Sequence, residues 1–290
     1  MASRGPWRRG HGARVMDLVA DGQVQPHFIS LGAGVQSSTM ALMAAHSEIN
    51  PMPTAAIFSD TQWEPPQVYD WLAWLEQQLP FPVMRVTAGS LREDVLRKQN
   101  ADAGRFASVP WHITNPDGST SMGRRQCTSE YKIQPLIKAR RRLMGYPPRV
   151  RIPAKSCVTW IGISIDEAAR MKDSLERWNV NRWPLIEAGM SRHDCLRWMD
   201  KHGYPAPPKS SCIGCPFHSD AEWRRIKANP VLWADAVAID AAIRQPVRGM
   251  KGEQFMHRSR KPLAEVDLTT LEDHGQLNMW NIECEGMCGV

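Results

Sequence analysis

The stretch ISLGAGVQSSTMALM, residues 29–43, decides the expected fold. An apolar start passes into small and hydroxyl residues and then into an apolar helical pattern, which predicts a strand, a tight turn and a helix. Turns of this kind cradle phosphate, because bare backbone N–H groups and the positive end of the helix dipole meet there. A lone Gly-x-Gly also occurs in ordinary turns, so this stretch alone leaves phosphate binding open.

Hydrophobic periodicity predicts further strands and helices in alternation along the chain. The expected strands are residues 27–30, 54–58, 82–86 and 156–163. The expected helices are residues 37–47, 66–78, 91–99, 129–144, 166–178 and 191–202. Strands separated by helices imply right-handed βαβ units. We therefore expect an α/β fold, with a parallel Rossmann-like sheet flanked by helices and a mostly helical C-terminal extension.

The domain organisation follows from the same pattern. We expect a flexible N-terminal arm at residues 1–26, a nucleotide-binding α/β domain at 27–185 and a helical, cysteine-containing region at 186–290. Residues 101–123 carry few periodic signals and are expected to form a long loop over a site.

The charge balance is moderately basic, with a formal net charge of +6 over 290 residues. The excess is concentrated between residues 124 and 151, which suits a polyanionic partner such as nucleotide phosphates, RNA or DNA. The alternative for the Arg140, Arg141 and Arg142 run is a solvated helix face. No apolar run reaches 18 residues and the first 22 residues lack the apolar core of a secretory signal, so we expect a cytoplasmic protein without a membrane partner.

Seven cysteines without an export signal favour metal or redox chemistry over a disulfide framework. The candidates for this chemistry are Cys127, Cys212, Cys215, Cys284 and Cys288. Two further cysteines, Cys157 and Cys195, lie in apolar strand or helix patterns and are expected in the core.

A second loop, SDTQWEPPQVY at residues 59–69, follows a buried strand. An acid such as Asp60 at the end of a strand can accept hydrogen bonds from a ribose or a base. The alternative is that Asp60 and Glu64 serve only the N-terminus of the next helix. Trp63 and Trp111, in loops beside the expected site, are candidates for base stacking.

Several motifs in register resemble one family. The segments SLGAGVQSS, SDTQWEPPQVY, RRQCTSEYKIQPL, GISIDEAARM, WPLIEAGMSRHDCLRWMDKHGYP and CIGCPF occur in the order found in the phosphoadenosine phosphosulfate (PAPS) reductase family of the PP-loop superfamily. The resemblance covers roughly residues 27–220. It implies that residues 32–38 form the PP-loop. One departure is Gln36, which stands where the superfamily's loop has Asp and puts the handling of Mg-ATP in question.

The resemblance also assigns site residues. Those implied at the nucleotide are Ser30, Gly32, Ala33, Gly34, Gln36, Ser37, Ser38, Asp60, Thr61, Gly162 and Glu167. Lys132 and Arg170 are implied as cationic partners of a phosphate or sulfate. Cys284, in a terminal Ile-Glu-Cys, resembles the nucleophile of the reductases' C-terminal Glu-Cys-Gly motif, although the His that follows there is absent.

Related enzymes bind a [4Fe–4S] cluster, and the resemblance implies ligation here by Cys127, Cys212 and Cys215, with nearby cations favouring thiolate. Cys284 or Cys288 could supply a fourth ligand, or the fourth position could stay open for a sulfur atom. Zinc is the alternative, with His218 or Cys284 as fourth ligand. A thioredoxin-like dithiol at Cys212 and Cys215 fits less well, because such motifs follow the first strand.

Three functions remain open. The first is iron–sulfur-dependent sulfur transfer to a nucleotide or nucleic acid, with ATP and a possible Mg²⁺ ion. The second is a sulfonucleotide reductase that releases sulfite from PAPS or adenosine phosphosulfate. The third is a non-catalytic accessory protein that binds nucleotide or nucleic acid. The expected partners are an adenine nucleotide, RNA or DNA, and a sulfur or electron donor protein, and the oligomeric state is open.

Overall fold

The computed structural model describes residues 25–98, 109–244, 252–269 and 273. The elements in chain order are β1 (His27–Leu31), α2 (Val35–Ala45), β2 (Ala55–Asp60), α3 (Pro66–Gln78), β3 (Val83–Thr87), α4 (Leu91–Arg97), β4 (His112–Thr114), β5 (Thr120–Met122), η1 (Thr128–Ile133), α5 (Gln134–Leu143), β6 (Cys157–Ile161), η2 (Ile165–Arg170), β7 (Asn179–Arg182), α6 (Pro184–Glu187), α7 (Arg192–Lys201), α8 (Asp220–Lys227), α9 (Pro230–Arg244), β8 (Glu253–Phe255) and η3 (Leu263–Glu265).

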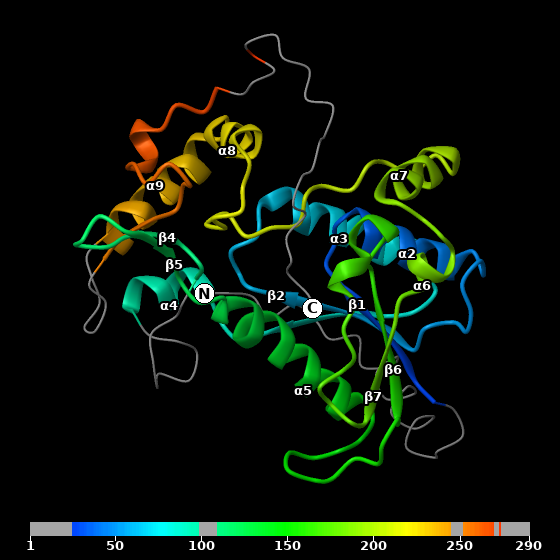
Figure 1. Ribbon diagram of the computed structural model, residues 1–290. Coiled ribbons are helices and arrows are strands. Elements are labelled where there is room, and N and C mark those ends of the chain that lie inside the picture. Colours follow the sequence, from blue (N-terminus) through cyan, green and yellow to red (C-terminus); the bar gives the residue numbers. More distant parts are fainter. Residues whose placement is uncertain (1–24, 99–108, 245–251, 270–272, 274–290) are drawn as a thin grey trace, which may run out of the picture.

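Five parallel strands form the central sheet in the order β3-β2-β1-β6-β7 (Figure 1). The expected α/β class, with helices on a parallel sheet, is confirmed. The chain moves outward from β1 through β2 to β3 and then returns to the other side of β1 as β6. This reversal opens a crevice beyond the carboxyl ends of β1 and β6, where ligands of open parallel sheets bind.

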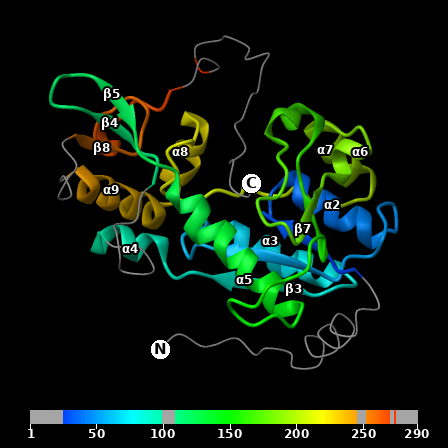
Figure 2. The same cartoon turned by 60° about the horizontal axis from the view of Figure 1, so that its bottom comes forward.

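Helices cover both faces of the sheet (Figure 2). Successive side chains of β1 point to opposite faces, so Ile29 joins the core under α2, α3 and α7, whereas Phe28 joins the core under α5. Cys157 and Cys195 are fully buried in these two clusters, which confirms them as core residues. Burial raises the pKa of the Cys157 thiol to about 12, so it is protonated and inert at neutral pH.

A third apolar cluster lies beside the sheet and packs α4, α8 and α9 against a small antiparallel sheet of order β5-β4-β8. The expected long loop at 101–123 is wrong where the structure describes it, because 112–114 and 120–122 pair as strands β4 and β5. Residues 99–108 and the N-terminal arm up to residue 24 lie outside the described residues. The domain limits stay a prediction, although α7 packs on α2 in the core of the sheet.

The helix expected at 166–178 is wrong. Only the 3-10 turn η2 forms, and the chain then runs to β7, a strand that the periodicity did not indicate. Leu175, on the expected apolar stripe, is fully exposed, while Trp178 is buried against α5 under the guanidinium of Arg140. Pairing of β7 with β6 therefore overrides the local helical pattern.

No helix of the described part of the chain is long and apolar enough to cross a membrane.

Pro135 explains an irregular turn ahead of α5. An α-helical N–H at this position would bond the carbonyl of Tyr131, but proline has no N–H to give. The chain widens into the π-helical turn η1, and the buried hydroxyl of Ser59 on β2 donates to the Tyr131 carbonyl at 2.7 Å. The turn is thereby fixed to the sheet.

Substitution Ser59→Ala should remove the donor to that carbonyl. A buried polar group left without a partner costs about 1–3 kcal/mol, so we expect a loss of unfolding free energy in that range, measured by urea denaturation. Ser156→Ala is the matched control, because Ser156 also donates to a carbonyl, that of Pro153 at 2.7 Å, but in an exposed turn where water replaces it. Equal losses in the two variants would contradict this account.

Candidate functional site

A cavity opens at the carboxyl ends of β1 and β6 and encloses about 790 Å³, including space open to solvent. We call it the loop cavity. The expected site residues that line it are Ser30, Gly32, Gly34, Gln36, Ser37, Lys132, Gly162, Glu167 and Arg170. Segments more than 100 residues apart in the sequence thus meet where the sheet topology predicts a ligand.

The loop after β1 is held by its own hydrogen bonds. The Gly32 N–H donates to Ser37 Oγ at 3.1 Å, and the Ser38 N–H donates to the Gly34 carbonyl at 3.1 Å as α2 begins. Ala33 takes a φ of 59°, in the left-handed region that favours glycine.

Gly162 closes the other wall of the loop cavity. A Cβ atom at this position would lie 2.8 Å from the Ser37 nitrogen and 2.9 Å from its Cα, both of them backbone atoms. The chain leaving β6 therefore approaches the start of α2 more closely than any side chain allows.

The charges lining the loop cavity favour an anion. Among the described residues that line the cavity, Lys132, Arg170 and Lys209 carry positive charge, and Glu167 is the one carboxylate. Glu167 pairs with Arg170 and accepts from Gln36 Nε2 at 3.2 Å. Because a carboxylate at position 36 would face Glu167, the neutral Gln36 suits its neighbour.

Sequence reasoning missed Lys209 and Ser210, which also line the loop cavity. Ser210 donates its hydroxyl to the Gly32 carbonyl, and Lys209 pairs with the buried Glu222 at 2.5 Å. The signal available was the Lys-Ser-Ser run immediately ahead of the C-I-G-C motif.

Some expected nucleotide residues lie elsewhere. Ala33 and Ser38 do not line the loop cavity, and the buried Ser38 accepts from the indole N–H of Trp71 in the core at 2.9 Å. Asp60 does not line the loop cavity either, and its Oδ1 accepts from the Gln62 N–H at 2.7 Å and from the Tyr69 hydroxyl at 2.8 Å.

A second cavity, which we call the cysteine cavity, encloses about 420 Å³ including open space. Cys127, Cys212 and Cys215 all line it, although the first lies 85 residues ahead of the second. Thr61 lines this cavity and not the loop cavity. Lys132 lines both, so the two cavities are neighbours.

The cysteine cavity fits a sulfide-containing cluster in its chemistry. Three cysteines line it, and Arg125 Nη2 and Thr128 Oγ1, buried beside it, have no hydrogen-bond partner. Such donors suit the negatively charged sulfur atoms of an iron–sulfur cluster.

A closed zinc site fits less well. Sulfur ligands of one tetrahedral zinc ion lie about 3.8 Å apart, as bonds of about 2.3 Å require. Among the described residues, the sulfurs of Cys127, Cys212 and Cys215 do not all lie within 4.8 Å of one another. His218 cannot complete the set through Nε2, because this nitrogen donates to the carbonyls of Cys212 and Ile213 at 3.0 and 3.2 Å.

The turn that carries two of these cysteines is shaped by tryptophans. A Cβ atom on Gly214 would lie 2.0 Å from the Trp63 ring, and the Trp111 indole N–H donates to the Gly214 carbonyl at 3.2 Å. Both rings are 3% exposed, so their expected role as stacking platforms is wrong. They hold the C-I-G-C turn in place.

Glu64 lies beside Cys212, a contact that sequence reasoning missed. Its Oε1 lies 3.3 Å from Cys212 Sγ, 3.2 Å from Thr61 Oγ1 and 3.5 Å from Lys132 Nζ, and its buried Oε2 has no hydrogen-bond partner. This carboxylate is placed to accept the Cys212 proton when the thiol becomes a ligand, while Lys132 offsets the added negative charge.

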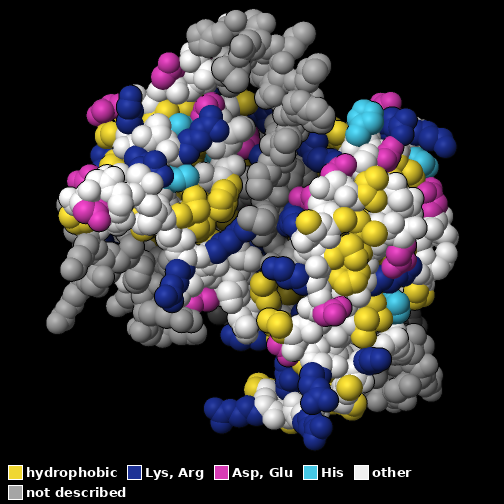
Figure 3. Space-filling model, in the orientation of Figure 1, with side chains coloured by type: hydrophobic (Ala, Val, Ile, Leu, Met, Phe, Trp, Pro, Cys, Tyr) yellow, Lys and Arg dark blue, Asp and Glu magenta, His cyan; other side chains and the backbone are white. Residues whose placement is uncertain are grey.

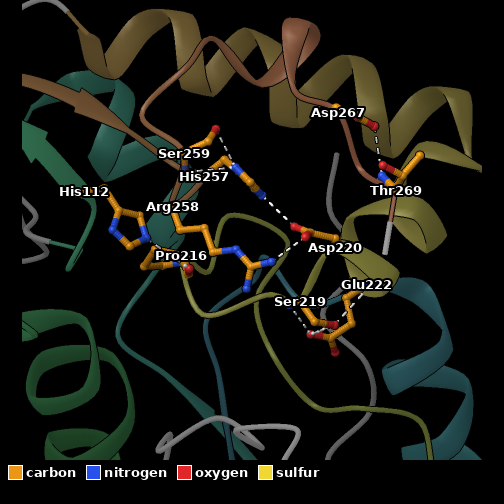
Figure 4. Close-up of polar contacts among 10 residues, drawn as sticks. All are labelled: His112, Pro216, Ser219, Asp220, Glu222, His257, Arg258, Ser259, Asp267 and Thr269. Carbon is orange, nitrogen blue, oxygen red and sulfur yellow. Dashed lines mark hydrogen bonds and ion pairs between the residues drawn. The ribbon is translucent and has the colours of Figure 1, made fainter. Parts of the chain in front are cut away.

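Polar contacts of the residues that follow the C-I-G-C turn join this turn to the small sheet of β4, β5 and β8 (Figure 4). The side chain of Asp220, in the first turn of α8, bonds His257 Nε2 at 2.8 Å and pairs with Arg258. His112 on β4 lies 3.5 Å from the carbonyl of Pro216, which follows the second cysteine of the turn. The cysteine turn is thus supported by segments before and after it in the chain.

Of the basic stretch, Arg125 and Lys132 line the cavities, but most of its cations lie elsewhere. Arg140 is buried and donates to Thr159 on β6, so it is no part of a nucleic-acid surface. Exposed cations gather at the loop between α5 and β6, where Figure 3 shows dark-blue side chains at the lower end of the molecule. This loop enters β6 at its amino end, the sheet edge opposite to the cavities. Cys284 and Cys288 lie outside the described residues.

Comparisons with known proteins give similarity in structure but none in sequence. No protein-family model and no curated protein matches the chain. The structure is similar to the phosphate complex of phosphoadenylyl-sulfate (PAPS) reductase from Candida auris, with a TM-score of 0.41 and 12% identity over 71% of this chain and 92% of that one.

Substitution Gly162→Ala should push the loop after β1 out of place, because the new Cβ meets backbone atoms that cannot rotate away. We expect a stability loss of about 1–3 kcal/mol and weaker binding of inorganic phosphate or ATP by calorimetry. Gly34→Ala is the control in the same cavity, since its Cβ would meet only Ser210 Cβ at an ordinary 3.7 Å. Normal phosphate binding by Gly162→Ala would refute the steric argument.

Glu222 should make stability depend on pH. Burial alone would raise the pKa of its carboxyl, but hydrogen bonds from His218 and Lys209 lower it from 4.5 to about 2. Because the carboxyl has a lower pKa in the folded than in the unfolded chain, its ionised form stabilises the fold at pH values above the unfolded pKa. This stabilisation is lost as the pH falls from about 4.5 towards 2. Denaturation across that range should show a flatter profile for Glu222→Gln, with the exposed Glu253→Gln as control. An unchanged slope would exclude this role.

Proposed function

We propose that this chain is an adenine-nucleotide-binding enzyme of the PAPS reductase family that carries out iron–sulfur-dependent sulfur transfer on a nucleotide or nucleic acid. The observation that carries the proposal is the shared position of Lys132, which lines both the loop cavity and the cysteine cavity. An anion bound in the first cavity would therefore react close to the thiols of the second.

The loop cavity supplies the binding of the anion. The first turn of α2 presents backbone N–H groups without helical partners, and Lys132, Arg170 and Lys209 add positive charge. Phosphoryl chemistry needs charge stabilisation and positioning more than covalent help, and these groups offer both. That the ligand contains adenosine is inferred from the resemblance to the family.

The cysteine cavity supplies the place of a [4Fe–4S] cluster, held by Cys127, Cys212 and Cys215. When bound, such a cluster with an iron lacking a protein ligand supplies a position at which sulfide can be activated. Glu64 takes up the proton that Cys212 loses on ligation, and Arg125 and Thr128 donate towards sulfur. Cys284 or Cys288 as fourth ligand stays a prediction.

The reaction balances without an added oxidant or reductant. A carbonyl-type oxygen of the substrate attacks the α-phosphorus of ATP, and pyrophosphate leaves. Inorganic sulfide then attacks the activated carbon, the carbon–oxygen bond breaks, and AMP departs with the oxygen. Lys132 and Arg170 hold the negative charge that builds on the departing phosphates.

A sulfonucleotide reductase is the second candidate, and the charge of the loop cavity favours it. Glu167 is the lining carboxylate among the described residues, and it is already paired with Arg170. A cavity with few acidic ligands for Mg²⁺ suits PAPS, whose reduction is not a pyrophosphate-releasing step. In this case the expected nucleophile is Cys284.

Anaerobically purified protein should carry about four iron and four sulfide atoms per chain, with the broad visible absorption of a cluster. Cys212→Ser and Cys215→Ser should each lose most of this iron and sulfide. Cys195→Ala is the control, because Cys195 is fully buried in the apolar core with α2 and α7, whereas Cys127 and Cys212 belong to a separate cluster. Full iron content in Cys212→Ser would contradict cluster ligation.

The products distinguish the candidate functions. Pyrophosphate release from ATP in the presence of RNA or DNA and sulfide would support sulfur transfer, and sulfite release from PAPS would support the reductase. Lys132→Ala should lower either rate by about 10²-fold or more, as loss of one charge-stabilising group does in other enzymes. Nucleotide binding without either product would leave an accessory role.

A further inference from the structure

We propose that His46, Glu48 and His202 form a binding site for a divalent first-row transition ion such as Zn²⁺, on the surface where α2 and α7 end. The ligand atoms of these three side chains lie within 4.8 Å of one another. Two imidazoles and a carboxylate are a donor set that suits zinc, nickel, copper or iron(II). The site is independent of the proposed function.

The spacing of the donors matches one ion. His202 Nε2 lies 3.6 Å from Glu48 Oε1. Two ligands at about 2.0–2.2 Å from a tetrahedral zinc ion lie about 3.4 Å apart, so a small rotation brings this pair to ligand distance. The ring centres of His46 and His202 are 5.1 Å apart, which allows both rings to point at a common ion.

Hydrogen bonds already orient the three ligands. His202 Nδ1 lies 2.8 Å from the Trp198 carbonyl, which only accepts, so Nδ1 carries the proton and Nε2 the lone pair. The indole N–H of Trp198 donates to Glu48 Oε2 at 2.8 Å and leaves Oε1 towards His202. His46 Nε2 bonds the Tyr204 hydroxyl at 2.8 Å, so Nδ1 carries the lone pair when Nε2–H donates.

This pattern is the one that metal sites use. A ligating histidine commonly donates its second ring N–H to a carbonyl, carboxylate or other oxygen, and a ligating carboxylate is itself hydrogen-bonded. The Trp198 and Tyr204 rings also stack on His202, with the Trp198 ring centre 4.0 Å away. The histidine ring is therefore held in one plane before any ion arrives.

The position in the fold favours a cation. His46 is the C-terminal cap of α2, and His202 is the C-terminal cap of α7. Both helix dipoles direct their negative ends at the site. An ion there would link the C-terminal ends of α7 and α2. The N-terminal end of α2 adjoins the loop after β1.

Titration of the full chain with Co²⁺ under reducing, anaerobic conditions tests the site. Cobalt bound by nitrogen and oxygen gives weak visible bands, whereas cobalt bound by cysteine adds an intense thiolate charge-transfer band, so the cysteine cavity is read separately. We expect one equivalent of the nitrogen–oxygen type, at least tenfold weaker in His202→Gln and in Glu48→Gln. Trp198→Phe should weaken binding by about 10–100-fold, because the N–H that orients Glu48 is lost and the ring that stacks on His202 becomes smaller.

His193→Gln is the matched control, since His193 is exposed on the same helix and lies outside the trio. It should bind Co²⁺ like the unaltered chain. Glu48 is exposed, so Glu48→Gln keeps the fold and decides the question if His202→Gln does not. Unchanged affinity in Glu48→Gln, an equal loss in His193→Gln, or charge-transfer bands alone would each overturn the proposal.

Discussion

The missing N–H of Pro135 is the constraint on which the arrangement of the two cavities depends. A regular α-helix through this residue would leave the Tyr131 carbonyl without a donor. The chain instead forms the π-helical turn η1, and the Ser59 hydroxyl donates to this carbonyl. In a turn with i to i+5 bonding, Cys127 and Lys132 stand one turn apart. Cys127, at one end of the turn, therefore lines the cysteine cavity, and Lys132, at the other end, lines both cavities.

On the opposite wall of the loop cavity, close contacts between backbone segments fix the loop after β1. Gly162 lets the chain leaving β6 touch the start of α2, and Ser210 reaches back to the Gly32 carbonyl. The loop after β1 is thus fixed by two segments that lie far from it in the sequence. Ala33 holds a left-handed conformation within this frame, at a cost that the surrounding contacts offset.

The sequence predicted the parallel sheet and most residues of the loop cavity, because periodicity and the order of motifs are carried by local residues. Asp60 and Ser38 do not line this cavity, because a motif gives only a position along the chain, and the packing of Tyr69 and Trp71 decides what each oxygen bonds. The contact between Glu64 and Cys212 was missed because 148 residues separate them in the sequence. The strand β7 was missed because pairing with β6 outweighs the helical pattern around Leu175.

Gln36 shows how one departure from a motif is linked to its surroundings. The superfamily's Asp would stand against Glu167, and two carboxylates at that distance need a metal ion or a shared proton to coexist. With Gln36 the amide donates to Glu167, whose other oxygen pairs with Arg170, so the wall is neutral without a metal. Lys132 and Lys209 add further positive charge to the lining, and each is itself paired, with Glu64 at 3.5 Å and with Glu222 at 2.5 Å. An ATP-dependent reaction in this cavity therefore needs its Mg²⁺ to arrive on the nucleotide, whereas a sulfonucleotide can use the cations directly.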